Sequence, residues 1–304
     1  MPSGVLRHVP RPQRPGEPAR ARALHRGGAR GVPRAPRTHT GGAGTVTDLS
    51  RFARPRAHRD PEVSPAGAAT TAPLDPGTRA ELAAFVDTHA DALYDADAET
   101  ILATVAEHVD GPVAVTMSME NTVLAELASR YLPDADLLFL DTGYHFEETL
   151  DVADGVRRRY ELPLVTATPI LTRAEQDATY GPALYRRNPT ACCRMRKVEP
   201  LAAAMSGYVG WVTGLRRADS PLRADTPAVT LDRTGRLKIS PLVTWSLEET
   251  ERYIVEHDLI RHPLTTRGYP SIGCATCTLP VAEGEDPRAG RWAGQNKTEC
   301  GLHT

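Results

Sequence analysis

Residues 112–169 read PVAVTMSMENTVLAELASRYLPDADLLFLDTGYHFEETLDVADGVRRRYELPLVTATP. Short runs rich in β-branched and apolar residues alternate here with amphipathic segments. The β-type runs are 112–117, 136–143 and 164–169, and the helical segments are 118–132 and 146–162. Strand–helix–strand–helix–strand is the order of a parallel sheet with crossover helices. The sequence therefore predicts an α/β fold with a twisted parallel sheet and flanking helices.

The flanking sequence extends this pattern in both directions. Apolar residues at helical spacing predict two helices within 79–109, and GYVGWVTGLR (207–216) predicts a fourth strand. Residues 228–240 resemble two strands joined around a Thr-Gly turn. A helix then follows, with Ser246 and Glu249 placed as a capping box.

Composition divides the chain into three predicted regions. Residues 1–75 are rich in Arg, Pro, Ala and Gly without apolar periodicity, so we expect a disordered segment. A basic nucleic-acid arm or a transit peptide has similar composition, and so does sequence upstream of a start codon assigned too early. We expect a solvated tail or such upstream sequence. An α/β domain is predicted at 76–266, and a cysteine-bearing C-terminal segment at 267–304.

The net charge of −2 hides an asymmetry along the 304-residue chain. Residues 1–60 carry 13 Arg and three acids, so the remainder has a net charge of −12. An acidic body is a poor non-specific nucleic-acid binder, and no nucleic-acid partner is expected. No apolar run has the length of a membrane span, and no secretory signal is recognisable. We therefore expect a cytoplasmic protein that does not interact with membranes.

The chain has five cysteines in three groups. Cys192 and Cys193 are adjacent, Cys274 and Cys277 form a C-x-x-C pair, and Cys300 lies near the end. In a reducing compartment a C-x-x-C indicates metal ligation or redox work. Four thiolates from two clips match a tetrahedral metal site or a four-iron cluster. One cysteine then remains for chemistry.

Three loops follow predicted strands at the edge where open parallel sheets bind ligands. TMSMENT places Ser118 at a predicted helix N-terminus, which suits an anion, although a simple capped turn has the same pattern. DTGYHFEET is the second loop. TGLRRADSPLR is the third; its arginines suit an anionic ligand or a solvated basic face. Candidate substrate-binding residues are Ser118, Arg216, Arg217, Arg223, Arg288, Arg291 and His303.

Several blocks give the chain a specific resemblance. It resembles assimilatory adenosine 5′-phosphosulfate (APS) reductases, the iron–sulfur branch of the phosphoadenylyl-sulfate reductase family. The blocks occur in family order across about residues 110–303. They are FLDTGYHFEET (139–149), CCRMRKVEPL (192–201), GWVTGLRRADSPLRADTP (210–227), GYPSIGCATCT (268–278), GEDPRAGRW (284–292) and KTECGLH (297–303).

The resemblance implies an adenine-nucleotide α-hydrolase-like fold and a 4Fe–4S cluster on Cys192, Cys193, Cys274 and Cys277. It also implies that Cys300 attacks the sulfur of APS, expels AMP and forms a thiosulfonate. Thioredoxin, or a glutaredoxin-like reductant, then releases sulfite. Lys197 is expected between cluster and substrate, and Arg288 and Arg291 at the phosphosulfate.

The remaining polar and aromatic candidates have less specific expected roles. His303 is either a base for the Cys300 thiol or a tail-docking residue. Tyr144 and His145 are expected to shape the nucleotide pocket. Trp211 and Trp292 are expected to pack.

Two alternative functions remain open at this point. A cluster-containing reductase could act on the 3′-phosphorylated nucleotide (PAPS), or on both nucleotides. A zinc-binding PP-loop protein, structural or nucleic-acid-modifying, could also use four thiolates. The sequence leaves the oligomeric state open, and a homo-oligomer is compatible with it.

Overall fold

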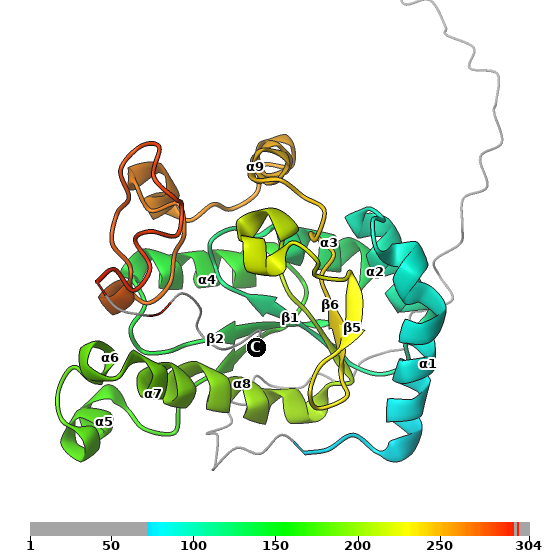
Figure 1. Cartoon of the computed structure of the whole chain (residues 1–304), viewed down its shortest axis with the longest axis horizontal. Coiled ribbons are helices and arrows are strands. Elements are labelled where there is room, and N and C mark those ends of the chain that lie inside the picture. The colour runs from blue at the N-terminus through cyan, green and yellow to red at the C-terminus, as the bar shows by residue number, and fades with distance from the viewer. Residues whose placement is uncertain (1–71, 295–296, 298–304) are drawn as a thin grey trace, which may run out of the picture. The chain divides into compact units, whose positions relative to one another are not determined.

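The computed structural model describes residues 72–294 and residue 297 (Figure 1). The helices are α1 (Pro76–Leu93), α2 (Ala98–His108), α3 (Val123–Tyr131), α4 (Glu147–Arg159), α5 (Arg173–Tyr180), α6 (Leu184–Arg187), α7 (Pro189–Cys193), α8 (Glu199–Ala204) and α9 (Leu247–Glu256). The strands are β1 (Val113–Met117), β2 (Asp136–Leu140), β3 (Leu164–Ala167), β4 (Gly210–Val212), β5 (Val229–Leu231) and β6 (Leu237–Ile239).

The strands form one sheet in the order β3-β2-β1-β4-β6-β5. All neighbouring pairs are parallel except β5 and β6, which are antiparallel. The chain moves outward from β1 to β3 and then returns to place β4 on the other side of β1. The carboxyl ends of β1 and β4 therefore flank a topological switch point, where open α/β sheets bind ligands. The predicted α/β fold class is confirmed.

Alternate residues of the central strands face two apolar layers. Val113, Val115 and Met117 of β1 belong to the larger core, with buried residues of α1 to α4 and α9. Ala114 lies on the other side, in a smaller cluster with Leu201 of α8. This alternation follows from the two-residue period of a strand. Figure 1 shows α3 and α4 on one side of the sheet and α8 on the other.

Local sequence signals set several element ends as expected. Helices α1 and α2 confirm the two helices predicted within 79–109. At α9, the Ser246 side chain accepts from the N–H of Glu249, and the Glu249 side chain accepts from the N–H of Ser246, which confirms the capping box. Strands β5 and β6 confirm the predicted hairpin, and Gly235 between them has φ +82°. Helices α5 to α8 had no sequence-based prediction.

The helix predicted from residue 118 begins instead at Val123. Met119 is buried and has φ 63°, a left-handed conformation that interrupts a helix. The backbone of 120–122 pairs with a distant segment: the N–H of Thr122 donates to the carbonyl of Ile260 at 3.1 Å, and that of His262 to Glu120 at 2.9 Å. Because these backbone groups pair across the fold, they do not enter α3.

Within the described residues, no helix has both the length and the apolar character needed to span a membrane. The region boundaries at 75/76 and 266/267 remain predictions.

Candidate functional site

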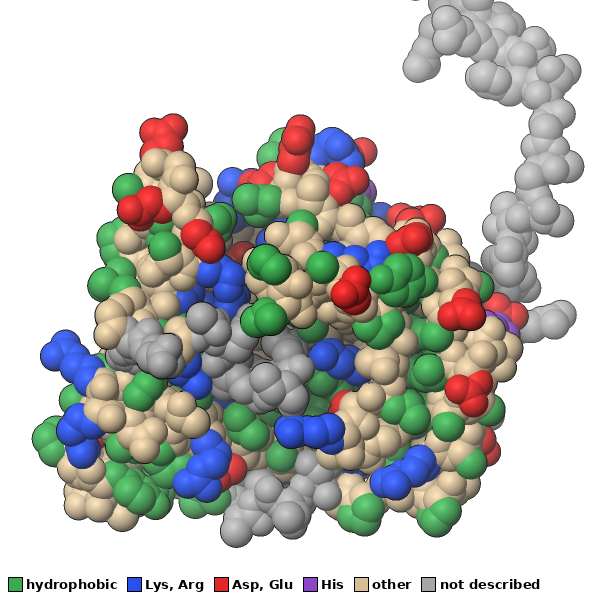
Figure 2. Space-filling model, viewed as in Figure 1, with side chains coloured by type: hydrophobic (Ala, Val, Ile, Leu, Met, Phe, Trp, Pro, Cys, Tyr) green, Lys and Arg blue, Asp and Glu red, His purple; other side chains and the backbone are tan. Residues whose placement is uncertain are grey.

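A cavity of about 390 Å³ opens at the carboxyl edge of the sheet. Loops after β1, β2, β4 and β6 line it, together with the C-terminal segment 270–292. The basic residues in its lining are Lys197, Arg216, Arg223, Arg288 and Arg291, and the acidic ones are Glu120, Asp219 and Asp286. Figure 2 shows Lys and Arg side chains around the middle of this face, between the C-terminal segment and α8. The cavity is thus suited to an anion.

The loop after β1 contributes Ser118 and Glu120. Ser118 is exposed, and its Oγ accepts a long contact of 3.4 Å from the N–H of Glu120. Ser118 lines the cavity, but it precedes Thr122, the N-cap of α3, by four residues. The expectation that Ser118 sits at a helix N-terminus was therefore wrong.

Glu120 is a half-buried carboxylate that joins this loop to the C-terminal segment. Its Oε2 accepts from the N–H of Ile272 at 3.3 Å. The pKa of Glu120 is raised, because the effect of burial exceeds the opposing effects of the Ile272 N–H and of the charges of Arg216 and Arg291. Sequence reasoning did not identify this residue as part of the site.

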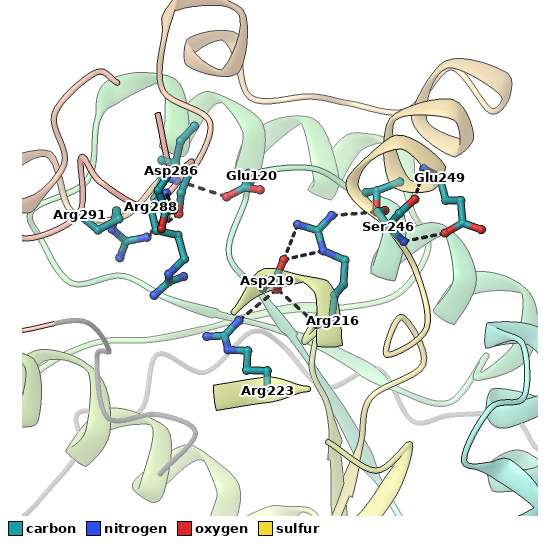
Figure 3. Close-up of polar contacts among 12 residues, drawn as sticks. Glu120, Arg216, Asp219, Arg223, Ser246, Glu249, Asp286, Arg288 and Arg291 are labelled. Carbon is teal, nitrogen blue, oxygen red and sulfur yellow. Dashed lines mark hydrogen bonds and ion pairs between the residues drawn. The ribbon is translucent and has the colours of Figure 1, made fainter. Parts of the chain in front are cut away.

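Two of the predicted arginines converge on Asp219, which the sequence analysis also missed. Arg216 donates to Asp219 Oδ1 from Nε at 2.8 Å, and its Nη2 lies 2.7 Å from the same oxygen. Arg223 Nη1 lies 3.1 Å from Asp219 Oδ2. Figure 3 shows both guanidinium groups directed at this carboxylate. Asp219 therefore links the arginines of the loop after β4.

Arg217 has a different environment, outside the cavity lining. Its Nη1 contacts Asp95 at 2.6 Å, its Nη2 donates to the carbonyl of Tyr94 at 2.7 Å, and its guanidinium lies 3.8 Å from the Tyr94 ring centroid. Nε donates to the carbonyl of Thr226. These contacts fasten the loop to the end of α1, so the structure does not bring Arg217 together with Arg216 and Arg223.

The C-terminal segment positions Arg288 and Arg291 across the cavity from this loop (Figure 3). Arg291 Nη1 donates to the carbonyl of Ile272 at 3.1 Å and to Ser271 Oγ at 3.2 Å. Its guanidinium lies against Gly273, where a Cβ would collide with it. A glycine is therefore needed for the close approach of Arg291 to the C-x-x-C loop.

The four cysteines predicted to ligate a metal or cluster line a second, small cavity, together with Lys197 and Trp292. Cys192, Cys193 and Cys274 are buried and Cys277 is half-buried. Cys192 and Cys193 come from α7, whereas the C-x-x-C pair comes from a 3₁₀ turn at Ala275–Cys277. The fold thus unites two cysteine clips that are 80 residues apart in the sequence.

Backbone contacts anchor the C-x-x-C turn to the sheet. The N–H of Ala275 donates to the carbonyl of Tyr144 at 2.7 Å, in the loop after β2. Thr142 Oγ1, in the same loop, lies 3.3 Å from Cys274 Sγ, and accepts from the N–H of Tyr144 at 3.2 Å. The hydroxyl has one proton to donate and a second acceptor lone pair, so either Thr142 or Cys274 can be the donor in their contact.

The donor set fits a sulfur-ligated iron cluster better than a site for harder ions, because thiolates favour iron–sulfur clusters, zinc and copper(I). Burial, and then the charges of the other three thiols, raises the pKa of Cys192 to about 12. A bound cation reverses this effect by favouring thiolates. In the described part of the chain, no three or more His, Cys, Asp and Glu side chains are arranged to hold one metal ion, so geometry of that kind does not support the fit. The fit therefore rests on the number and chemistry of the thiols.

Lys197 and Trp292 line both cavities. Lys197 lies in a π-helical turn, Arg194–Val198, directly after the cysteine pair, and π turns occur often at functional sites. Arg196 of the same turn is buried, and its Nε and Nη1 donate to the carbonyls of Thr142 and Leu171. Arg196 thereby fixes the turn to the loop after β2. Sequence reasoning gave it no role.

The remaining candidates divide between the two cavities and the core. His145 lines the larger cavity, and burial lowers its pKa; Tyr144 lines the cysteine cavity. Trp211 is buried in the smaller core cluster, where its Nε1–H donates to Asp232 at 3.0 Å. Cys300 and His303 lie outside the described residues. Lys297, three residues before Cys300, has its Nζ 3.5 Å from Thr190 Oγ1.

Several known proteins are similar to this chain in sequence or in fold. The family described as the phosphoadenosine phosphosulfate reductase domain matches residues 112–280. An adenosine 5′-phosphosulfate reductase of Streptomyces coelicolor is 50% identical over 234 residues, which are 77% of this chain and 99% of that protein. A protein of the same name from Mycolicibacterium smegmatis is 46% identical over 227 residues, 74% of this chain and 96% of that protein.

A solved structure from a reductase of related name has a similar fold. It is a phosphoadenylyl-sulfate (PAPS) reductase from Candida auris in complex with phosphate, with 25% identity and a TM-score of 0.57. The similarity covers 64% of this chain and 96% of that one. The matched family model, the similar relatives and the shared fold together show that the chain belongs to the phosphoadenosine phosphosulfate reductase family.

Proposed function

We propose that this protein is an adenylyl-sulfate reductase of assimilatory sulfate reduction, which converts APS to sulfite and AMP. The observation that carries the proposal is the shared wall of the two cavities: Lys197 and Trp292 line both the basic cavity and the four-cysteine cavity. The relatives named adenosine 5′-phosphosulfate reductase, at 44–50% identity, favour APS over PAPS as the substrate.

The basic lining of the cavity is suited to the phosphosulfate group. An approaching thiolate and an anionic substrate repel each other, so cations must offset both charges before attack. Arg288 and Arg291 enter the cavity from the C-terminal segment, and Lys197 enters from the side of the cysteines. Arginine suits the oxygens of phosphate and sulfate because its planar group forms two parallel hydrogen bonds. In our proposal these three residues offset the charge of the substrate.

Cys300 is the proposed nucleophile. Its thiolate attacks the sulfate sulfur, an S–S bond forms, and the S–O bond to phosphate breaks, with its electron pair leaving on AMP. The product is a Cys300 thiosulfonate. A dithiol protein of the thioredoxin or glutaredoxin type then supplies two electrons, leaving as a disulfide and releasing sulfite and the Cys300 thiol. AMP is a good leaving group, so this step needs little acid catalysis.

Cys192, Cys193, Cys274 and Cys277 are the proposed ligands of a 4Fe–4S cluster. When bound, such a cluster supplies a redox-capable iron–sulfur core whose properties depend on charge and hydrogen bonding around its sulfurs. Residues of this chain that influence the thiols are Arg196 at Cys192, Thr142 at Cys274, and Thr276 and Lys197 at Cys277. We further propose a cytoplasmic location.

A turnover assay with thioredoxin tests the function directly. We expect APS to give sulfite with a much higher kcat/KM than PAPS at matched concentrations. Without thioredoxin, APS should add one sulfonate mass to the peptide that contains Cys300, and Cys300→Ser should abolish both results. A preference for PAPS, or the added mass on another cysteine, would contradict the proposal.

Metal analysis separates this function from the zinc-protein alternative. We expect iron with acid-labile sulfide and visible absorbance. Replacement of any one of the four ligand cysteines by Ser should lower the iron content, whereas Cys300→Ser should leave it unchanged. Colourless protein that contains stoichiometric zinc after anaerobic purification would favour the alternative.

A further inference from the structure

Asp219 is a carboxylate in a cavity that we propose to bind an anion. Two like charges 4 Å apart repel by about 1 kcal/mol in bulk water and by more where water is partly excluded. Asp219 therefore weakens anion binding unless it performs another task. Its contacts indicate what that task is.

The Asp219 side chain is the common partner of two arginines. Its Oδ1 lies 2.8 Å from Arg216 Nε and 2.7 Å from Nη2, which makes a two-point contact. Its Oδ2 lies 3.1 Å from Arg223 Nη1 and 3.3 Å from the backbone N of Arg216. The three side chains are only 13–16% exposed, so solvent screening is weaker than for a surface ion pair.

A second contact fixes Arg216 from the opposite side. Its Nη1 donates to Thr250 Oγ1 at 2.9 Å, and that hydroxyl donates to the carbonyl of Ser246 at 2.8 Å. Ser246 is the N-cap of α9, and Thr250 is buried. Arg216 is therefore held between its own loop and a helix that begins 31 residues later.

A flexible arginine loses roughly 2 kcal/mol of rotamer entropy when it is immobilised. If this loss occurs before the ligand arrives, binding is stronger. We propose that Asp219 is a positioning residue, which holds Arg216 and Arg223 in place so that the phosphate of the nucleotide meets two prearranged guanidinium groups. This inference rests on the proposed function, because it takes the cavity as the nucleotide site.

Calorimetric titration of the full-length protein with AMP and with adenosine tests the inference without turnover. Wild type should bind AMP more tightly than adenosine. Asp219→Asn should weaken AMP binding by about tenfold to a hundredfold, because two side chains lose their fixed positions, and should leave adenosine binding within about twofold. Asp225→Asn removes the same charge from an exposed position of the same loop and should change neither affinity.

The effect must also depend on the two arginines. In a protein with Arg216→Gln and Arg223→Gln, adding Asp219→Asn should no longer weaken AMP binding, and the loss of like-charge repulsion should strengthen it slightly. An equal weakening in both backgrounds overturns the inference, and so does a parallel loss of AMP and adenosine binding in Asp219→Asn. A wild-type protein that binds AMP no better than adenosine contradicts the proposed function itself.

Discussion

Lys197 occupies the position in the fold where the two cavities share a wall. Its place follows from its neighbours in the chain, because a π-helical turn directly after Cys193 presents Arg196 and Lys197 in succession. Arg196 is buried against the loop after β2, whereas Lys197 is half-buried and reaches both cavities. Adjacent basic residues thus have separate roles, one in fixing the turn and one at the site.

Lys197→Ala should reduce turnover strongly while the cluster still assembles. Loss of one partner from a desolvated charge contact decreases binding of the transition state by about 2–5 kcal/mol, which is about 30-fold to several thousand-fold in rate. Sulfite release measured beside iron content checks this result. Arg186→Ala, an exposed basic residue on α6, is the control and should keep full activity. Loss of iron in Lys197→Ala would mean that the lysine supports the cluster instead.

The sequence identified the chemical types at the site but not the direction of each side chain. Arg216 and Arg217 are neighbours in one block, yet one lines the cavity and the other stacks on Tyr94 of a distant helix end. Arg216 is held by Asp219, three residues later in a short 3₁₀ turn, whereas Arg217 is held by Asp95, which only the tertiary fold brings close to it. The four cysteines were easier to group, because their two clips and the number of thiols limit the possible arrangements.

The C-terminal segment is held by close backbone contacts rather than by α-helices or strands. The N–H of Leu279 donates to the carbonyl of Gly290 at 2.9 Å, and the N–H of Trp292 to that of Cys277 at 3.0 Å. These bonds bring the C-x-x-C turn beside Arg291 and Trp292. A Cβ at Gly290 would collide with the carbonyl oxygen of Leu279.

Gly290→Ala should therefore displace the C-terminal segment from the C-x-x-C turn. The backbone oxygen of Leu279 cannot rotate away as a side chain does, so we expect a loss of about 1–3 kcal/mol in the free energy of unfolding. Iron content, Trp fluorescence and denaturant unfolding measure the effect. Gly207→Ala is the control, since a Cβ there meets no atom within 4 Å. Equal stability of the two variants would show that the segment adapts at no cost.

The strands and helices could be predicted from the sequence where the local preference of the residues is the same as the conformation that the tertiary fold imposes. The alternation in 112–169 predicted β1, β2 and β3 and the helices between them. The start of α3 was not predictable, because residues 120–122 pair with 260–262, which lie about 140 residues later. The short helices α5 to α8 lack a long periodic signal. Residues of α6 and α7 pack in the cluster that contains the cysteines, and α8 packs against the sheet.

Ala72, the first residue that the structure describes, contacts two distant parts of the chain. Its N–H donates to Ser206 Oγ at 3.1 Å, and its carbonyl accepts from Arg236 Nη2 at 2.7 Å. Arg236 is buried, with its Nε donating to the carbonyls of Met205 and Tyr208. The predicted disordered segment, residues 1–75, lies outside the described residues except for its last four positions.

Deletion of residues 1–70 should leave turnover and the melting temperature nearly unchanged. The composition of this segment cannot support a core, and the deletion keeps the contacts of Ala72. Thermal unfolding and the turnover assay on the shortened protein check this. A deletion of residues 1–75 serves as the contrast, because it removes both Ala72 and the helix-capping Asp75. Equal behaviour of the two shortened proteins would show that these contacts contribute nothing.

His262 links three parts of the molecule through a fully buried imidazole. Its Nδ1 accepts from the N–H of Leu264 at 3.2 Å, so its Nε2–H donates to Thr149 Oγ1 of α4 at 2.9 Å. Its backbone N–H donates to the backbone carbonyl of Glu120 in the loop after β1. Burial lowers the pKa of His262; Glu148 opposes this shift and His145 reinforces it. The folded protein therefore favours the neutral ring more than the unfolded chain does.

The free energy of unfolding should consequently fall as the pH drops below about 6.5, the value for the unfolded chain, and level off below the folded pKa. The unfolded chain binds the proton first in this range, and the slope is at most about 1.4 kcal/mol per pH unit for one histidine. His262→Asn keeps an acceptor near the Nδ1 position but cannot titrate. It should be less stable at pH 7.5 and show a smaller loss between pH 7.5 and 5.5 in denaturant unfolding. His108→Asn, at an exposed position on α2, should keep the wild-type slope. If His262→Asn kept it too, another group would have to carry the pH dependence, and the buried imidazole would not be the titrating link between α4 and the loop after β1.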